Sequence, residues 1–158
     1  MRFRDPISGT ITIDVDPDRA YGVLCDPPRM AEFAEETVAA DWLGGATRAA
    51  VGARFRGANR HGRRLWYTRC RVTDADPDRR RFAYEVATPF KVPICRWQYE
   101  VEDAPDGGCV VTETCWIRAP VWFIPFAILI TGVLDRPGAN KAHIATTLAR
   151  LKAHLEAA

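Results

Sequence analysis

The sequence lacks the residues and spacings that hold metals or build disulfide frameworks. Its five cysteines are an odd number and none of them is spaced as C-x-x-C, which argues against a disulfide framework and a zinc site. Histidine is equally scarce. The three residues His61, His143 and His154 lie far apart, so a metal site or a Ser-His-Asp relay is not encoded locally. We therefore expect no metal and no cofactor.

The N-terminal segment has no apolar core of the kind found in secretory signals before Thr10. Together with the cysteine usage, this predicts a cytoplasmic protein with reduced thiols. Lysine is also rare: of the 22 cationic residues, 19 are arginine and three are lysine. Arginine is the side chain that binds carboxylate and phosphate groups in bidentate fashion.

The chain has 158 residues and 47% of them are apolar, which is enough for a substantial core and predicts one domain over residues 1–158. The charged fraction of 27% argues against wholesale disorder. The formal net charge of +2 conceals an uneven distribution, with −5 over residues 1–47, +8 over residues 48–81 and −1 over residues 82–158. The basic middle is the feature that needs an explanation.

Alternating apolar residues predict a strand at residues 10–15, followed by a short helix at residues 19–25 that Asp16 caps and Pro27-Pro28 ends. A second helical turn is expected at residues 29–33. Six further strands are then predicted, separated by Gly, Pro and Asp turns. They span residues 37–43, 53–59, 65–73, 81–87, 95–102 and 109–117.

A final helix is predicted at residues 139–157, where one stripe carries four apolar side chains. They are Ile144, Leu148, Leu151 and Leu155. The fold class is therefore α+β, with two short helices after the first strand and a curved antiparallel sheet wrapped around a long C-terminal helix. One helix does not fill such a sheet, so we expect a volume between them.

The alternation also predicts which side chains face that volume. Aromatic and small polar residues share the inner face, whereas Arg54, Arg56, Arg69 and Arg71 share the outer one. A solid core and a ligand pocket are both compatible with any single aromatic residue, but wide aromatic side chains interrupted by small polar ones favour a pocket. The predicted lining comprises Phe55, Asn59, Trp66, Thr68, Tyr84, Trp97 and Tyr99.

Several segments of the sequence are similar to those of a known protein family. They are ITIDVDPDRAY at residues 11–21, WLGG at residues 42–45 leading to VGARFRG at residues 51–57, VTDADP at residues 72–77, WQYEV at residues 97–101 and VTET at residues 111–114. In order and spacing the chain resembles the SRPBCC, or START-like, superfamily of helix-grip proteins, especially its polyketide cyclase/dehydrase-like branch. The resemblance implies a seven-stranded sheet around the C-terminal helix and a cavity for lipids or polyketides.

The resemblance also suggests site residues. The pocket arginine of aromatase/cyclases falls on Arg71, their strand tryptophan on Trp97 and their entrance tryptophan near Phe33, so Phe33 joins the expected lining. A second pocket arginine falls near Val86, which is apolar, and the alternation sends Arg71 to the outer face. Both departures weigh against aromatase chemistry.

Catalysis would need a proton acceptor and donors for a developing enolate. The candidates are Glu113, Arg71 and Tyr84. Glu113 faces inward if it shares a face with Val111, and burial would then raise its pKa. The alternative register, which we favour, places Val110 and Trp116 inward and pairs Glu113 with an arginine in solvent. Asn140 either orients a ligand or caps the C-terminal helix.

Residues 121–134 carry no charge. They are too few for a transmembrane helix and are broken by Pro125 and Gly132. A lid over the cavity is the preferred interpretation, with Trp122, Phe123, Phe126 and Leu129 touching the ligand or core. A homodimer contact is the next alternative, and a membrane-surface helix is disfavoured because a basic face is lacking.

We therefore expect the chain to bind a hydrophobic small molecule, with a polyketide cyclase/aromatase or dehydratase as the alternative. Nucleic-acid binding is not expected, because the outer-face arginines are explained by cross-strand glutamates. The exception is a hairpin tip where Arg60, Arg63 and Arg64 gather without acidic neighbours in sequence. That tip is the candidate contact for an anionic group or an acyl carrier protein, in a monomer or a homodimer.

Overall fold

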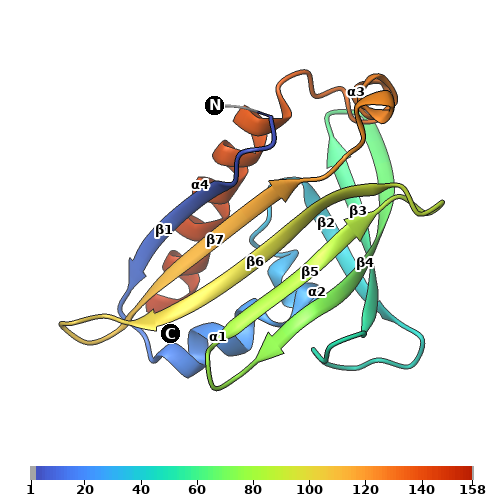
Figure 1. The fold of residues 1–158 in the computed structure, drawn as a ribbon. Helices are drawn as coiled ribbons and strands as arrows, with labels where there is room; N and C mark the ends of the chain where they lie inside the picture. The colour runs from blue at the N-terminus through green and yellow to red at the C-terminus, as the bar shows by residue number, and fades with distance from the viewer. Residues whose placement is uncertain (1–2, 158) are drawn as a thin grey trace.

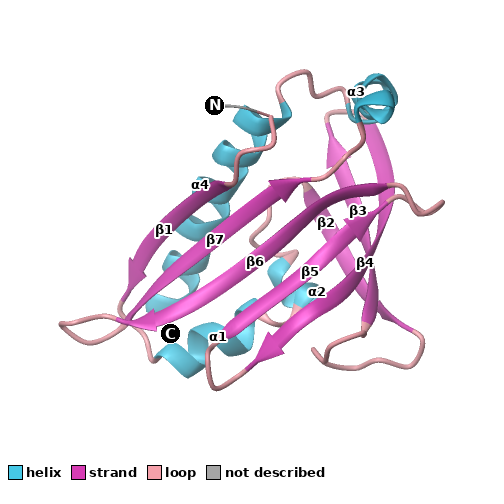
Figure 2. Ribbon diagram, in the orientation of Figure 1, coloured by secondary structure: helices cyan, strands magenta, loops and turns pink. Residues whose placement is uncertain are grey.

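The computed structural model describes residues 3–157; Met1, Arg2 and Ala158 lie outside the described residues, and with them the first residues of the segment in which we expect no secretory signal. Seven antiparallel strands form one curved sheet in the order β1-β7-β6-β5-β4-β3-β2 (Figure 1). The strands are β1 (Ile7–Ile13), β2 (Thr37–Leu43), β3 (Arg54–His61), β4 (Arg64–Asp76), β5 (Arg81–Ala87), β6 (Pro93–Asp103) and β7 (Cys109–Ile117). The predicted sheet around a long C-terminal helix, with two short helices after the first strand, is confirmed (Figure 2).

The predicted bounds of β2, β5 and β7 are correct, those of β3 and β6 differ from the structure by one or two residues at each end, and those of β1 and β4 are wrong. β1 begins at Ile7 and ends at Ile13, because the residues from Ile7 onward already pair with β7. β4 continues to Asp76, through the segment where a turn was expected, because a bulge between Val72 and Asp74 keeps it paired with β5. The Asp76 carboxylate then accepts from the next backbone N–H groups and makes the turn itself.

The two short helices are α1 (Pro17–Leu24) and α2 (Pro27–Met30). Asp16 caps α1 as predicted, since its carboxylate accepts from the backbone N–H groups of Asp18 and Arg19. Pro27-Pro28 follow the end of α1, as predicted, but the second helix begins at Pro27 and not at residue 29. These prolines also open α2, because proline is well suited to the first helical turn, where an N–H needs no partner.

The long helix α4 (Arg136–Glu156) packs on β1 and β7. Its predicted apolar stripe is confirmed, since Ile144, Leu148, Leu151 and Leu155 are all buried. The cap is Asp135, whose carboxylate accepts from the Gly138 N–H at 3.1 Å, so Asn140 is not the capping residue. Helix and sheet lie close together at Gly9, where a Cβ atom would lie 2.6 Å from Ile144 Cγ2.

Between β7 and α4 the apolar segment forms a 3-10 turn, η1 (Val121–Phe123), and the helix α3 (Ile124–Thr131), which contacts β4. Gly132, with φ of 74°, ends α3 in the left-handed region. No single helix within residues 3–157 is long and apolar enough to cross a membrane. Residues 121–131 and 136–156 meet that criterion only when taken together, as a pair bent by 57°.

The outer face of the sheet carries the arginines, but not all of them meet glutamates as predicted. Arg71 pairs with Glu85 at 3.2 Å. The residues opposite Arg54 and Arg56 are Arg71 and Arg69, and the Arg56 guanidinium lies over the Tyr67 ring at 5.1 Å. Aromatic stacking and exposure to water therefore accommodate part of this charge.

Candidate functional site

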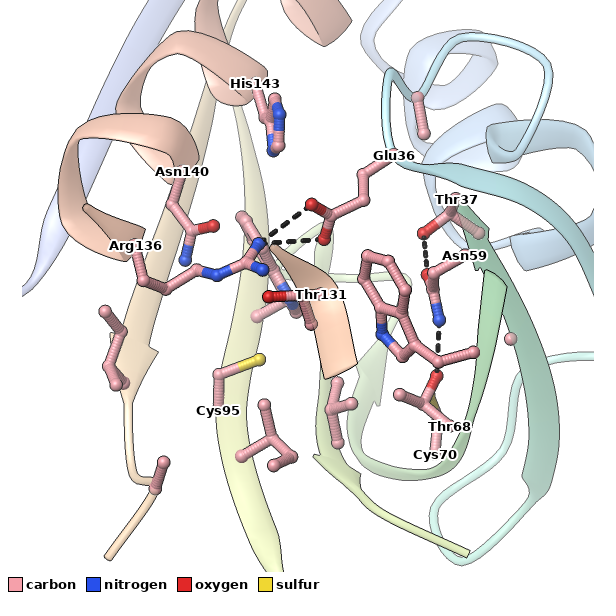
Figure 3. Close-up of a pocket in the computed structure, with 18 of the residues that line it drawn as sticks. Glu36, Thr37, Asn59, Thr68, Cys70, Cys95, Thr131, Arg136, Asn140 and His143 are labelled. Atoms are coloured by element: carbon pink, nitrogen blue, oxygen red, sulfur yellow. Dashed lines mark hydrogen bonds and ion pairs between the residues drawn. The ribbon is translucent and has the colours of Figure 1, made fainter. Parts of the chain in front are cut away.

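A cavity of about 400 Å³ lies between the inner face of the sheet, α4 and α3 (Figure 3). Its wall is mostly apolar and aromatic, with contributions from six of the seven strands, β2 to β7. The volume falls within the range of small-molecule sites, roughly 300–1,000 Å³. The wide, aromatic-lined pocket expected from the alternation is therefore present as a space, and not only as a packed core.

The structure brings most of the predicted site residues to this wall. Asn59 and Thr68 are buried there, and Tyr84 and Tyr99 lie on neighbouring strands. The predicted residues that line the cavity are Phe55, Asn59, Trp66, Thr68, Tyr84, Trp97, Tyr99, Glu113 and Asn140.

Four predicted site residues lie elsewhere. Phe33 is buried against the His154 ring, with 5.0 Å between ring centroids, because α2 turns it toward the C-terminal end of α4. Trp122 and Phe126 are exposed and pack on Phe123, because η1 and α3 turn other side chains inward. Of the other two expected lid contacts, Phe123 is buried at the cavity wall, whereas Leu129 is exposed. Arg71 is exposed on the outer face, where it pairs with Glu85, so the pocket position that the resemblance suggested is wrong.

Sequence reasoning missed the polar residues that α4 and the segment before β2 contribute. Arg136, His143 and Thr147 line the cavity together with the predicted Asn140. Their spacing of three to four residues follows the helical period, so the stripe that identified Ile144 contains the signal. The inward residues of α3, Ile124, Ala127 and Ile128, carried no such signal because the helix is apolar on every side.

One polar group of the wall is a short hydrogen-bond chain on β2, β3 and β4. Thr37 Oγ1 donates to Asn59 Oδ1 at 2.8 Å, and Asn59 Nδ2 donates to Thr68 Oγ1 at 3.2 Å (Figure 3). Gly57 makes room for the chain, since a Cβ atom there would lie 2.7 Å from Thr68 Oγ1. These side chains satisfy one another, so they form a polar wall segment that needs no ligand.

The other polar group contains a buried acid, and it corrects the favoured register of β7. Glu113 is 3% exposed and lies on the inner face with Val111 and Cys115, while Trp116 faces outward beneath the Arg96 guanidinium at 5.1 Å. The register follows from β6, whose inner row places Tyr99 directly opposite Glu113. Glu113 is therefore not paired with an arginine in solvent.

Tyr99 Oη donates to Glu113 Oε1 at 3.0 Å, and Glu113 Oε2 has no hydrogen-bond partner within residues 3–157. Burial raises the pKa of Glu113 from about 4.5 to about 8, and the hydrogen bond from Tyr99 opposes part of that rise. Burial also raises the pKa values of Tyr99 and Tyr84. The carboxyl group is thus largely protonated at neutral pH, and both phenols are neutral.

Three buried thiols, those of Cys70, Cys95 and Cys115, also lie at or next to this wall. Asn140 Nδ2 donates to Cys115 Sγ at 3.5 Å. Burial raises the pKa of Cys70 well above its ordinary range, and the hydrogen bond with Cys95, together with burial, does the same for the pKa of Cys115. Such thiols are poor nucleophiles, because the thiolate is the reactive form. Within residues 3–157, no three His, Cys, Asp or Glu side chains gather as metal ligands.

An ion pair stands at the end of the cavity nearest the start of α4. Arg136 donates from one nitrogen to both carboxylate oxygens of Glu36 at 2.9 Å, with both side chains about four-fifths buried (Figure 3). The pair is compensated within itself. Glu113 is the buried acid of the wall, and no ion pair is described for it, whereas Glu35 of the wall is exposed.

Comparison with known proteins agrees with this architecture. The family model for polyketide cyclase / dehydrase and lipid transport matches residues 6–156. None of the curated proteins matches the sequence. Among solved structures, major latex-like protein 151 from Panax ginseng has a TM-score of 0.71 at 12% identity, covering 96% of this chain and 97% of that one.

Two further structures show the same fold. DR_A0006 from Deinococcus radiodurans has a TM-score of 0.68 at 15% identity, covering 97% of this chain and 98% of that one. The di-domain ARO/CYC BexL from the BE-7585A biosynthetic pathway has a TM-score of 0.64 at 20% identity, covering 99% of this chain and 47% of that one. The sheet, the enclosed helix and the family match lead to one assignment: the chain belongs to the polyketide cyclase / dehydrase and lipid transport family of helix-grip proteins.

Proposed function

We propose that the protein binds a lipid- or polyketide-like hydrophobic small molecule in the cavity between sheet and α4. The observation that carries the proposal is the cavity itself, about 400 Å³ in volume and walled mainly by aromatic and aliphatic side chains. Burying an apolar ligand against such a wall is favourable at roughly 25 cal/mol per Å² of apolar surface. We also propose a cytoplasmic location, which the five free thiols support.

The segment η1–α3 forms a lid over the cavity, and the ligand enters where this lid lies. Its inward residues line the cavity, and Phe123 packs against Phe90 of the β5–β6 hairpin at 6.3 Å between ring centroids. Large apolar side chains on its outer side are exposed, which is costly for a segment without a function. These are Val121, Trp122, Phe126 and Leu129.

The basic hairpin tip lies beside this lid, since the Arg64 side chain packs on Gly132 at the end of α3. Arg60 and Arg63 are exposed next to it. We assign to these two arginines the contact with an anionic group, either on the ligand or on an acyl carrier protein that delivers it. Arg64 supports the lid.

The second candidate function is catalysis on the bound ligand, as a polyketide cyclase or dehydratase. The buried Glu113, with Tyr99 on one oxygen, is the observation that favours it, because such reactions need an acid or base inside a dry cavity. Loss of turnover in Glu113→Gln with ligand binding retained would support this candidate. Full turnover in that variant would contradict a catalytic role of Glu113 and leave ligand binding as the proposed function.

Fluorescence titration with N-phenyl-1-naphthylamine, a neutral hydrophobic fluorophore, tests binding. Ala40→Phe fills the cavity from β2, whereas Ala39→Phe places the same ring on an exposed neighbour. We expect saturable enhancement in the wild type and in Ala39→Phe, and its loss in Ala40→Phe with unchanged circular dichroism. Equal titrations for both variants would contradict binding in the cavity. Native mass spectrometry of protein from its own host should show a retained ligand.

A further inference from the structure

Glu113 is an acid without a counterion inside the cavity wall. It is 97% buried. The phenols of Tyr84 on β5 and Tyr99 on β6 and the thiol of Cys115 on β7 interact with it, and Cys95 on β6 and Asn140 on α4 lie against Cys115. β1 contributes Gly9, which is paired with Glu113 and carries no side chain.

The charged groups of the cavity wall do not neutralise this acid. Arg136 is committed to Glu36, and Glu35 and His143 lie with them toward the start of α4. A buried carboxyl without a cation is more stable in its protonated form. The neutral acid then has one proton to donate. Tyr99 donates to Oε1, so that proton belongs on Oε2, which has no acceptor among the described residues.

A buried O–H without an acceptor costs on the order of 1–3 kcal/mol, and a ligand that supplies the acceptor recovers part of that cost. Oε2 is enclosed by protein atoms. The terminal torsion of a glutamate is soft, so a small rotation turns the O–H toward the cavity that Glu113 lines. Tyr99 limits this rotation and thereby fixes the direction in which the proton is offered.

We propose that the protonated Glu113 carboxyl, oriented by Tyr99, donates a hydrogen bond to a ketone-type carbonyl oxygen of the ligand. The proposal rests on the proposed function, since it names the ligand chemistry of the same cavity. It specifies a hydrophobic molecule with a carbonyl group at the end that reaches Glu113. A cationic amine is the competing chemistry, because an ionised Glu113 would bind it as an ion pair.

Three compounds of one skeleton separate these chemistries: 2-acetylnaphthalene, its carbonyl-free analogue 2-isopropenylnaphthalene and the amine 1-(2-naphthyl)ethylamine. Each is titrated into the full-length protein at pH 6.5 and pH 9. We expect the wild type at pH 6.5 to bind the ketone about threefold to tenfold more tightly than the alkene. At pH 9, where Glu113 has lost its proton, the preference disappears.

The variants Glu113→Gln and Glu113→Leu complete the test. The amide N–H of glutamine also donates and does not titrate, so Glu113→Gln keeps the ketone preference at both pH values and controls for every other titrating group. Glu113→Leu removes the donor, and with it the preference at both pH values. Should Glu113→Leu fail to fold, the pH dependence of the wild type against Glu113→Gln still decides.

Equal binding of ketone and alkene by the wild type at pH 6.5 would overturn the carbonyl anchor and leave the proposed function standing. Tightest binding of the amine, lost in Glu113→Gln, would overturn it in favour of an ion pair. Failure of all three compounds to bind would instead overturn the proposed function, and the anchor with it.

Discussion

Arg136 and Glu36 join the start of α4 to the segment before β2, across 100 positions of sequence. A cation in the first turn of a helix is unfavourable, because the helix dipole places positive charge there. Glu36 offsets this cost with two oxygens at 2.9 Å, and the joined pair forms part of the cavity wall. The ion pair therefore ties together the two elements between which α3 closes the cavity.

Breaking this ion pair is expected to loosen that end of the cavity. Arg136→Ala leaves a partly buried carboxylate unpaired, so we expect the free energy of unfolding to fall by about 1 kcal/mol and N-phenyl-1-naphthylamine to dissociate faster. Urea denaturation and stopped-flow displacement measure the two effects. Arg118→Ala, which breaks a more exposed pair with Glu85, is the control and should change neither by much. Similar effects of both substitutions would show that the pair at α4 has no special role.

Glu113 is expected to make the protein less stable as the pH rises. Its folded pKa of about 8 lies above its ordinary value of about 4.5, so between these pH values the folded state holds a proton that the unfolded state has lost. The contribution of Glu113 is most favourable below about pH 4.5 and falls by up to about 1.4 kcal/mol per pH unit until about pH 8. Urea denaturation from pH 5 to 8 should show this decline, and Glu113→Gln should remove it. Parallel pH profiles of the two proteins would contradict the buried, protonated acid.

Most inner-face residues were predictable because their strands alternate cleanly between apolar and charged side chains. On β3, Phe55 and Asn59 alternate with three arginines, and one register alone keeps those arginines in water. Tyr99 was predictable for the same reason, since charged or polar neighbours flank it on β6. Where one face is plainly polar, local sequence determines the wall of the cavity.

Glu113 was not predictable from its own strand, because both faces of β7 mix polar and apolar residues. Its register depends on which row of β6 it joins and on Arg96 covering Trp116 from outside, which are contacts between strands. The prediction that Trp122 and Phe126 touch the ligand or core was wrong for another reason. A helix that is apolar all round has no period that distinguishes its faces, so only its packing on β4 decides which residues line the cavity.

Arg60 and Arg63 are expected to strengthen binding of anionic ligands only. The double variant Arg60→Glu/Arg63→Glu should weaken binding of dodecyl phosphate by about threefold to tenfold at low ionic strength, with a smaller effect in 0.2 M salt, because exposed charges are screened. Binding of the neutral 1-dodecanol should not change. Arg54→Glu/Arg69→Glu makes the same change of charge on the outer face. If isothermal titration shows equal weakening for both double variants, net charge and not the hairpin tip is responsible.

The close contact between β1 and α4 predicts opposite effects for two glycine-to-alanine substitutions. At Gly9 the new methyl group would lie 2.6 Å from Ile144 Cγ2, so Ile144 and the turn of α4 that carries it must shift, and we expect a loss of about 1–3 kcal/mol in the free energy of unfolding. At Gly22, an exposed position in α1, the methyl group meets no atom within 4 Å. Alanine there should stabilise the protein by about 0.5–1 kcal/mol, because it restricts the unfolded chain and favours the helix. Urea denaturation compares the two variants with the wild type.

Because α4 also carries Asn140 and Arg136, its displacement in Gly9→Ala should weaken binding of N-phenyl-1-naphthylamine, whereas Gly22→Ala should bind it normally. A stable, normally binding Gly9→Ala protein would show that the helix is not held against β1 at this distance.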